Sequence, residues 1–352
     1  PYFCLSYTLF SLMEKKKKKQ LSLLVCYVLT LVVILSRALF GAFTVSESRI
    51  LFVDNDDTID SIYAKTSPNR NILSRPVFAV LNVLTGYPKH IKPGRYEVGN
   101  STSVLQVYRN LRNGKQAPVR LTIPVLRTNH DLAAFLGKNF QASTEDFEAV
   151  LQDSALLATF QKTPATAVCL FVPNTYELYW TLQPKALLER MNKEAQKFWN
   201  DKRVLEAKQL GLTPDEVMTV ASIVEQETAY NPEKPMVAGM YLNRLNQKMP
   251  LQADPTVKFA LGDFALRRIL HEHLRVNSPY NTYKVKGLPP GPICIPSVES
   301  INAVLHRANH NYLYMCAKED FSGSHNFATT YAEHQKNAAK YAAALNARGI
   351  RS

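Results

Sequence analysis

TPDEVMTVASIVEQETAYNPEKPMVAGMYLNRLNQKMPLQADPT, residues Thr213–Thr256, is the stretch around which the fold is organised. Thr213 suits an N-cap, Pro214 suits the first helical position, and Glu216 lies where an acid completes a capping box. Apolar residues then recur at helical spacing, namely Val217, Val220, Ala221 and Val224. We therefore predict a helix that begins at Pro214 and buries an apolar stripe.

Two carboxylates, Glu225 and Glu227, interrupt the end of this stripe. At about 100° per residue they lie roughly 160° apart around the helix axis, one on each flank of the apolar face. They therefore cannot point the same way, so one can enter a cleft while the other faces water or caps a neighbouring element. Spacing does not decide between them, and two ordinary surface glutamates are the plain alternative.

Polar loops stiffened by proline follow the predicted helix: LQADPT at 251–256 and SPYNTYKVKGLPPGP at 278–292. Such loops suit carbohydrate, because sugar rings stack on tyrosine while sugar hydroxyls bond to amides and acids. The candidate substrate-binding residues in these loops are Gln252, Asp254, Thr256, Asn281, Thr282 and Tyr283. For each one alone, a hydrogen bond that only stabilises its loop explains the residue equally well.

Several motifs in register resemble those of the YceG-like family. They are ASIVEQET at 221–228, YLNRL at 241–245, LQADPTV at 251–257, SPYNTY at 278–283, GLPPGPI at 287–293, YLYMCA at 312–317 and HNF at 325–327. The resemblance covers roughly residues 123–344. Two positions depart from the family pattern: Val125 and Leu126 replace its usual Glu-Gly, and Asn174 replaces its usual Asp. The second departure favours a structural role for the segment around Asn174.

The resemblance implies a membrane-anchored lytic transglycosylase that needs no cofactor and cuts nascent peptidoglycan strands endolytically. In the family motif S-I-V-E-x-E-T the first glutamate is taken as the catalytic acid, and it falls on Glu225, with Glu227 as the reserve. His325 lies in a G-x-H-x-F motif and is a candidate for lining the cleft. Coupling to peptidoglycan synthases is likewise implied only by resemblance.

The chemistry implied is cleavage of the β-1,4 bond between N-acetylmuramic acid (MurNAc) and N-acetylglucosamine (GlcNAc). The leaving oxygen must be protonated, and a carboxylic acid can do this near neutral pH only if burial raises its pKa. Attack by the C6 hydroxyl of MurNAc then gives a 1,6-anhydro end, so one glutamate can serve as acid and then base. Hydrolysis usually needs a second carboxylate, for which Asp254 is the candidate. A hydrolytic muramidase and a non-catalytic glycan-binding scaffold therefore stay open as alternatives.

Composition is that of a folded protein with room for two domains: 352 residues, 46 % hydrophobic and 20 % charged. The net charge is +13, but only the run Lys15–Lys19 is concentrated. We find no nucleic-acid motif and expect no nucleic-acid partner; a basic surface suits an anionic membrane or peptidoglycan. The HEH sequence at 271–273 has no third ligand nearby, so we predict no metal site.

The N-terminal region predicts a membrane anchor. We interpret Met13 as the native start and residues 1–20 as a cytoplasmic tail, followed by a transmembrane helix over 21–43. The run Lys15–Lys19 precedes the apolar stretch, so the positive-inside rule puts the N-terminus in the cytoplasm and the bulk outside the bacterial inner membrane. A cleaved signal peptide is the alternative.

The predicted fold class is α+β throughout. After the anchor we expect a small LysM-like α+β module over 44–120, which either binds glycan or is a plain spacer, and a larger α+β catalytic domain over 121–352. Within this domain we predict one long helix over 184–210, a polar loop over 321–327 and a closing helix over 330–347. Cys169, Cys294 and Cys316 are expected to be buried free thiols.

Overall fold

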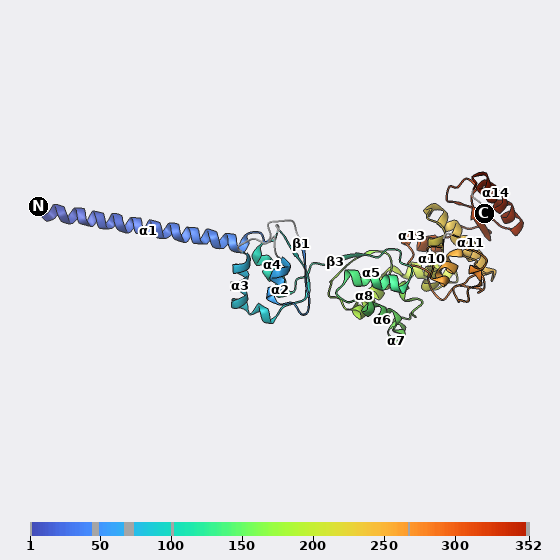
Figure 1. The fold of residues 1–352 in the computed structure, drawn as a ribbon, viewed down its shortest axis with the longest axis horizontal. Coiled ribbons are helices and arrows are strands. Elements are labelled where there is room, and N and C mark those ends of the chain that lie inside the picture. The colour runs from blue at the N-terminus through green and yellow to red at the C-terminus, as the bar shows by residue number, and fades with distance from the viewer. Residues whose placement is uncertain (1, 44–48, 67–73, 100–101, 267, 350–352) are drawn as a thin grey trace. The chain divides into compact units, whose positions relative to one another are not determined.

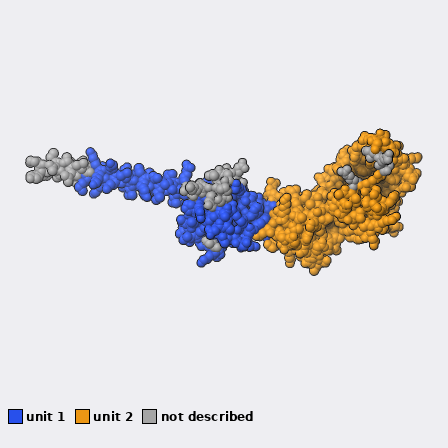
Figure 2. Space-filling model, viewed as in Figure 1, with its two compact units in different colours: residues 1–119, 179–181 blue, residues 120–178, 182–352 orange. Residues whose placement is uncertain are grey.

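The computed structural model describes residues 2–43, 49–66, 74–99, 102–266 and 268–349 (Figure 1). Its contacts divide the chain into two compact units (Figure 2). Unit 1 contains residues 1–119 and 179–181, and unit 2 contains residues 120–178 and 182–352. Both units combine helices with two-stranded sheets, which confirms the predicted α+β class.

Unit 1 begins with one long helix, α1 (Tyr2–Phe40). Its stretch Met13–Phe40 is long and apolar enough to cross a membrane: its most apolar 18-residue window has a mean hydropathy of 2.4 and is only 6 % buried. An exposed helical segment that is apolar all round, as residues 21–36 are, suits lipid rather than a protein core. This agrees with a membrane anchor, although the helix starts well before the predicted Leu21.

The rest of unit 1 is a small antiparallel sheet covered by short helices. Strand β1 (Arg49–Val53) pairs with β2 (Gly94–Val98), with Leu51 opposite Tyr96. The helical elements are α2 (Ile59–Thr66), α3 (Ser74–Thr85), the 3₁₀ turn η1 (Tyr87–Lys89) and α4 (Val104–Asn113). Their buried aromatic side chains form the core together with Leu51 and Val53. The LysM likeness and the predicted domain boundaries stay predictions.

The first part of unit 2 holds a second apolar core. It is built from β3 (Val119–Thr122), α5 (Asn129–Asn139), α6 (Thr144–Gln152), α7 (Ser154–Ala158), η2 (Ala167–Leu170), β4 (Thr175–Leu178) and α8 (Pro184–Phe198). Strands β3 and β4 form a two-stranded sheet. Capping boxes start α5 and α6, with Thr128 and Ser143 as the N-caps. These caps fix where each helix begins and hence how its apolar face meets the core.

The single helix predicted over 184–210 is wrong. The structure has two helices, α8 and α9 (Asp201–Gln209), because the chain leaves helical geometry at Trp199. Asn200 then starts α9 as an N-cap, and its side-chain oxygen accepts a hydrogen bond of 3.1 Å from the backbone N–H of Arg203. An asparagine that satisfies an N–H of the first turn favours a new helix start over a continuous helix.

The predicted central helix is α10 (Pro214–Glu227), and its capping box of Thr213 and Glu216 is confirmed. Every residue from Val217 to Val224 is buried, so the helix is enclosed on all sides and not along one stripe only. Helices α11 (Lys234–Asn246), α12 (Asp254–Leu261) and α13 (Val298–Leu305) pack against it. The short turns η3 (Asn231–Glu233) and η4 (His273–Arg275) lie in the connecting segments.

A hairpin and a helix complete unit 2. Strand β5 (Tyr314–Ala317) pairs antiparallel with β6 (His325–Ala328), and α14 (Tyr331–Ala347) packs on both strands. His325 therefore begins a strand and does not lie in the predicted loop. Likewise, Asp254 begins α12 where the sequence predicted a turn. Proline in the first turn of that helix costs no internal hydrogen bond.

The prediction of free thiols is confirmed for the three cysteines of unit 2. Cys169 and Cys294 are buried, whereas Cys316 is half-buried. Burial raises the pKa of the Cys294 thiol to about 12. A thiol that is buried and protonated is chemically inert, which agrees with a packing role for this residue.

Candidate active site

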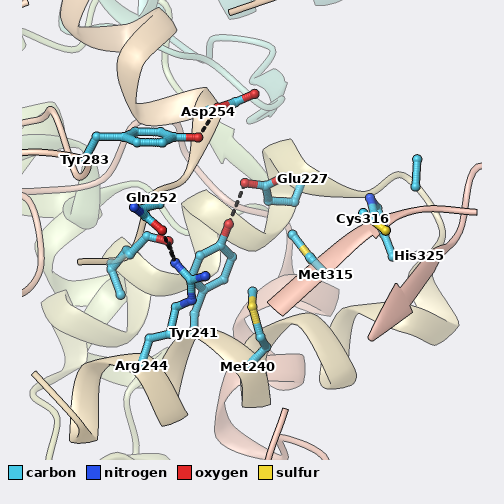
Figure 3. A pocket seen from close by; sticks show the side chains of 12 residues that line it. Glu227, Met240, Tyr241, Arg244, Gln252, Asp254, Tyr283, Met315, Cys316 and His325 are labelled. Atoms are coloured by element: carbon cyan, nitrogen blue, oxygen red, sulfur yellow. Dashed lines mark hydrogen bonds between the residues drawn. The ribbon is translucent and has the colours of Figure 1, made fainter. Parts of the chain in front are cut away.

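The C-terminal end of α10 borders an open pocket of about 210 Å³ in unit 2 (Figure 3). The residues that line it come from α10, α11, the α11–α12 connection, the start of α12, the segment before Lys284, and the β5–β6 hairpin. They are Glu227, Met240, Tyr241, Arg244, Leu251, Gln252, Asp254, Tyr283, Met315, Cys316, Ala317 and His325. Five of the predicted site residues thus meet in one pocket, with polar groups around an apolar wall.

Glu227 is the last residue of α10, and its side chain points into this pocket. Its Oε1 accepts a hydrogen bond of 2.6 Å from the hydroxyl of Tyr241. Burial and, to a smaller extent, the negative charge of Asp254 raise the pKa of Glu227 to about 7; the Tyr241 bond and the positive charges of His325 and Lys258 oppose that rise. The carboxyl group can therefore hold a proton near neutral pH and also release it.

Glu225 lies on the opposite flank of α10 and has a different environment. Its Oε2 accepts hydrogen bonds from the backbone N–H of Ser297 at 3.1 Å, from the Ser297 hydroxyl, and from the Ser300 hydroxyl at 2.5 Å. It also pairs with Lys234 at 3.2 Å, whose side chain is only 4 % exposed. Burial alone would raise the pKa of Glu225, but these hydrogen bonds and the Lys234 charge outweigh it and hold the pKa below its usual value.

The two glutamates therefore have different structural roles, as their positions on opposite flanks of α10 allow. Glu225 caps the N-terminus of α13, where the helix dipole and a free N–H favour an anion. Glu227 enters the pocket. The prediction that one enters a cleft while the other caps a neighbour is confirmed, and Glu227 is the one that lines the pocket.

Asp254 and Tyr283 form a second carboxylate–tyrosine pair in the pocket. The Tyr283 hydroxyl donates a hydrogen bond of 2.6 Å to Oδ1 of Asp254. Burial and the Asp254 charge raise the pKa of Tyr283 far above its usual value, so its hydroxyl stays protonated and remains a donor. The pair thus presents an acceptor carboxylate at the start of α12, close enough to Glu227 to affect its pKa.

Arg244 was not predicted as a site residue, although it lies in the YLNRL motif. Its guanidinium is buried and donates to the carbonyls of Leu313 at 2.5 Å and Leu251 at 2.9 Å, and to Oε1 of Gln252 at 3.1 Å. Arginine suits this place because its planar group can donate in several directions at once. These hydrogen bonds join the segment before β5 to the loop that carries Gln252, and so they stabilise two parts of the pocket wall.

Three other predicted residues stabilise the loops and do not line the pocket. The Thr256 and Thr282 hydroxyls bond to each other at 2.8 Å, and Thr282 Oγ1 also accepts from the N–H of Ala253 at 3.0 Å. Asn281 donates to the carbonyls of Leu274 and Val276 at 2.9 and 2.8 Å. All three polar side chains are fully buried and paired, as buried polar groups must be. The hydrogen bonds of these three residues therefore stabilise their loops, which was the alternative to a role in sugar binding.

His325 lines the pocket and is fixed by Glu233. Its Nδ1 lies 2.8 Å from Oε2 of Glu233, and its backbone N–H donates to Oε1 of the same carboxylate at 2.7 Å. Glu233 is only 7 % exposed, so the pair is largely shielded from water. A carboxylate bonded to one ring nitrogen fixes the orientation of the imidazole. Within the described part of the chain, no group of three or more His, Cys, Asp or Glu residues could hold a metal ion.

A family model for the YceG-like family matches residues 51–340 of this chain. The chain belongs to this family. The match spans most of unit 1 and nearly all of unit 2, including every residue of the pocket. The resemblance stated for roughly residues 123–344 is therefore confirmed, and the match begins earlier in the chain, at residue 51.

Members of the family with named activities are similar to parts of this chain. An endolytic murein transglycosylase of Bacillus subtilis (strain 168) is 36 % identical over 162 residues, which are 46 % of this chain and 43 % of that protein. An endolytic murein transglycosylase of Streptococcus pneumoniae serotype 2 is 28 % identical over 285 residues, covering 71 % of this chain and 51 % of that protein. The chain thus spans about half the length of the curated relatives it matches.

A solved structure of the family has the same fold. It is a crystal structure of a YceG-like protein from Listeria monocytogenes, with a TM-score of 0.55 and 27 % sequence identity. The likeness covers 82 % of this chain and 98 % of that structure. Membership of the family therefore rests on fold as well as on sequence.

Proposed function

We propose that this protein is an endolytic lytic transglycosylase, a carbon–oxygen lyase that cuts the MurNAc-β-1,4-GlcNAc bond of nascent peptidoglycan strands and so ends their elongation. The names of the relatives support the substrate and reaction class. The observation that carries the proposal for this chain is Glu227, a pocket carboxyl with a pKa of about 7. We assign the acid to Glu227, in place of the Glu225 expected from the family motif.

Protonation of the leaving oxygen is the first step. In this proposal Glu227 donates its proton to the glycosidic oxygen as the C1–O bond breaks, and the released GlcNAc hydroxyl keeps that proton. Positive charge then develops at C1 of MurNAc. Asp254 lines the same pocket and supplies a negative charge that stabilises this transition state. The Tyr283 hydroxyl orients the Asp254 carboxylate while it does so.

Closure of the anhydro ring is the second step. The ionised Glu227 accepts the proton of the MurNAc C6 hydroxyl while O6 bonds to C1. This gives the 1,6-anhydro end and restores the protonated acid without consuming water. A pKa near the working pH suits a group that must both donate and accept in one cycle. Tyr241 holds the carboxyl in place through its hydrogen bond.

Glu225 has a positioning role in this scheme. Its ion pair with Lys234 and its contacts to Ser297 and Ser300 join the end of α10 to α11 and α13. A carboxylate whose pKa is lowered by so many partners stays ionised at neutral pH and cannot act as an acid there. It instead fixes the helix turn that directs Glu227 into the pocket.

We also propose that α1 anchors the chain in the bacterial inner membrane with the N-terminus in the cytoplasm. The apolar stretch Met13–Phe40 supports the anchor, and the run Lys15–Lys19 supports the orientation. Unit 2 then works on the outer side, where nascent glycan strands are made. Peptidoglycan synthases are the partners that this placement suggests.

A hydrolytic muramidase is the second candidate, because Asp254 and Glu227 line one pocket. Two carboxyl groups can activate a water or form a covalent intermediate. A glycan-binding scaffold without activity is less favoured, because a binding protein has no need for a buried carboxyl group with a raised pKa.

Product analysis tests the proposal. The full chain in detergent is incubated with uncrosslinked glycan strands, and the fragments are analysed by mass spectrometry beside a Glu227→Gln control. We expect internal cuts whose new MurNAc ends are lighter by one water than reducing ends, and none with the control. Reducing ends would instead establish the muramidase, and intact strands would establish the scaffold.

A further inference from the structure

A second groove borders the same end of α10. Its pocket, of about 160 Å³, is lined by Arg127, Gln226, Pro255, Lys258, Phe259, Phe264 and Ile293. We call it the Arg127 groove. Two neighbouring hollows also contain Arg127 in their walls, and they extend the groove along the surface of unit 2. Of these residues, only Lys258 enters the chemistry described above, through the effect of its charge on the pKa of Glu227.

The Arg127 groove lies directly beside the catalytic pocket. Glu227 lines the pocket while the preceding residue, Gln226, lines the groove. In the same way Asp254 lines the pocket while Pro255 lines the groove. The same two short segments, the end of α10 and the start of α12, therefore contribute side chains to both cavities.

The cations of the groove are free to bind an anion. Arg127 lies over the ring of Phe264, 4.9 Å from its centroid, and donates to the amide oxygen of Gln226 at 3.3 and 3.4 Å. Within the described residues, neither Arg127 nor Lys258 has an ion pair within 4.0 Å. An arginine held by an aromatic ring and an amide keeps donors in the direction of its ligand at a low entropic cost.

The charge of the groove is positive. No acidic residue lines the groove itself. Asp131 lines a neighbouring hollow, where its carboxylate accepts a hydrogen bond of 3.0 Å from the N–H of Thr128 in the capping box of α5. Phe259 and Phe264 add apolar surface beside the two cations. The groove therefore suits a ligand that is both carboxylate-bearing and partly apolar.

We propose that the Arg127 groove binds the carboxylate-bearing stem peptide of a MurNAc residue, next to the bond that is cut. This rests on the proposed function, because the strand must occupy the catalytic pocket. Each MurNAc carries on its lactyl group a peptide with several carboxylates, whereas a strand stripped of its peptides keeps only the single lactyl carboxylate beside each MurNAc ring. The enzyme thereby prefers strands that still carry their peptides over strands from which the peptides have been removed.

A binding experiment separates this proposal from the catalytic one. All proteins carry Glu227→Gln, so that strands are not cut, and the charge variant adds Arg127→Gln with Lys258→Gln. The matched control adds Lys185→Gln with Lys208→Gln, two exposed lysines of unit 2 outside the groove. Affinity is measured for peptide-bearing strands and for strands stripped of peptides by an amidase.

We expect the charge variant to lose about tenfold in affinity for peptide-bearing strands, since two charged hydrogen bonds are lost. Its affinity for stripped strands, and the affinities of the control, should stay within about twofold. An equal loss on both kinds of strand, an equal loss in the control, or no loss at all would overturn the proposal. Absence of cleavage by the wild-type chain would contradict the proposed function. The affinity difference could still be measured, because the binding assay does not depend on cleavage.

Discussion

The hydroxyl of Tyr241 donates a hydrogen bond of 2.6 Å to Oε1 of Glu227, across the turn between α10 and α11. This bond favours the ionised carboxylate, whereas burial favours the protonated one, and burial prevails. The resulting pKa of about 7 suits Glu227 to the proposed roles of acid and base at neutral pH. In the proposed mechanism, Tyr241 therefore lowers the pKa of Glu227 from the value that burial alone would give.

Replacing Tyr241 by Phe should move that range. Without the donor, the ionised form of Glu227 is less stable, so its pKa rises by roughly one unit, as the loss of one hydrogen bond to a charged group implies. We expect the alkaline fall of kcat/KM to move from near pH 7 toward pH 8. The check is a pH–rate profile beside Tyr230→Phe, a control in an exposed tyrosine. An unchanged alkaline limb would show that Tyr241 does not set this pKa.

Replacing Glu225 by Gln should lower stability more than activity. The change leaves the buried Lys234 without its partner, and loss of one member of a buried pair costs about 3 kcal/mol. Because the folded-state pKa of Glu225 is lowered, its contribution is present above the usual pKa of 4.5 and disappears as pH falls through the folded value. The free energy of unfolding in urea is measured at pH 7 and at pH 3 for wild type, Glu225→Gln and Glu189→Gln, a control at an exposed glutamate. The difference between wild type and Glu225→Gln should be smaller at pH 3. Equal stability at pH 7 would contradict it.

Replacing Glu227 by Gln should have the opposite effect on stability. The raised pKa of Glu227 means that the contribution of this residue to wild-type stability is greatest below pH 4.5 and is lost as pH rises through about 7. Glutamine avoids burying that charge, so we expect the variant to be about 1–2 kcal/mol more stable than wild type at pH 8 and equal to it at pH 4. Thermal unfolding at the two pH values is the measurement. A variant that is less stable than wild type at pH 8 would show that the ionised Glu227 carboxylate does not destabilise the fold.

Replacing Asp254 by Asn tests lytic transglycosylation against hydrolysis. In the proposed scheme Asp254 only stabilises charge, so we expect a loss of about tenfold in kcat, with anhydro ends still formed. Because its charge raises the pKa of Glu227, the alkaline limb should also move to lower pH. Mass spectrometry of the products and a pH–rate profile give both readouts. Complete loss of cutting would assign Asp254 an essential role, as in a two-carboxylate hydrolase.

Local sequence patterns predicted the central helix well. The capping box at Thr213 fixed its start, and helical spacing placed Glu225 and Glu227 on opposite flanks. The pattern could not say which flank faces the pocket, because that depends on distant residues. Ser297 and Ser300, more than seventy positions later, bind the Glu225 carboxylate at the start of α13 and so keep it away from the pocket.

Long-range contacts also explain the other differences. Thr256 and Thr282 were candidates for sugar binding, yet they bond to each other across 26 positions, which no local pattern reveals. Arg244 and Glu233 support the pocket through partners on the β5–β6 hairpin and were missed for the same reason. The helix break at Asn200, by contrast, carried a local signal, since asparagine is a favoured N-cap.

The most direct test of the central claim compares the two glutamates as catalysts. Single-turnover rates on uncrosslinked strands are measured at 25 °C and pH 6.5 for wild type, Glu225→Gln and Glu227→Gln, with folding of each verified by circular dichroism. We predict a loss of at least about a thousandfold for Glu227→Gln, which cannot donate a proton, and of less than about tenfold for folded Glu225→Gln. A thousandfold loss with Glu225→Gln and near-normal rates with Glu227→Gln would contradict the account.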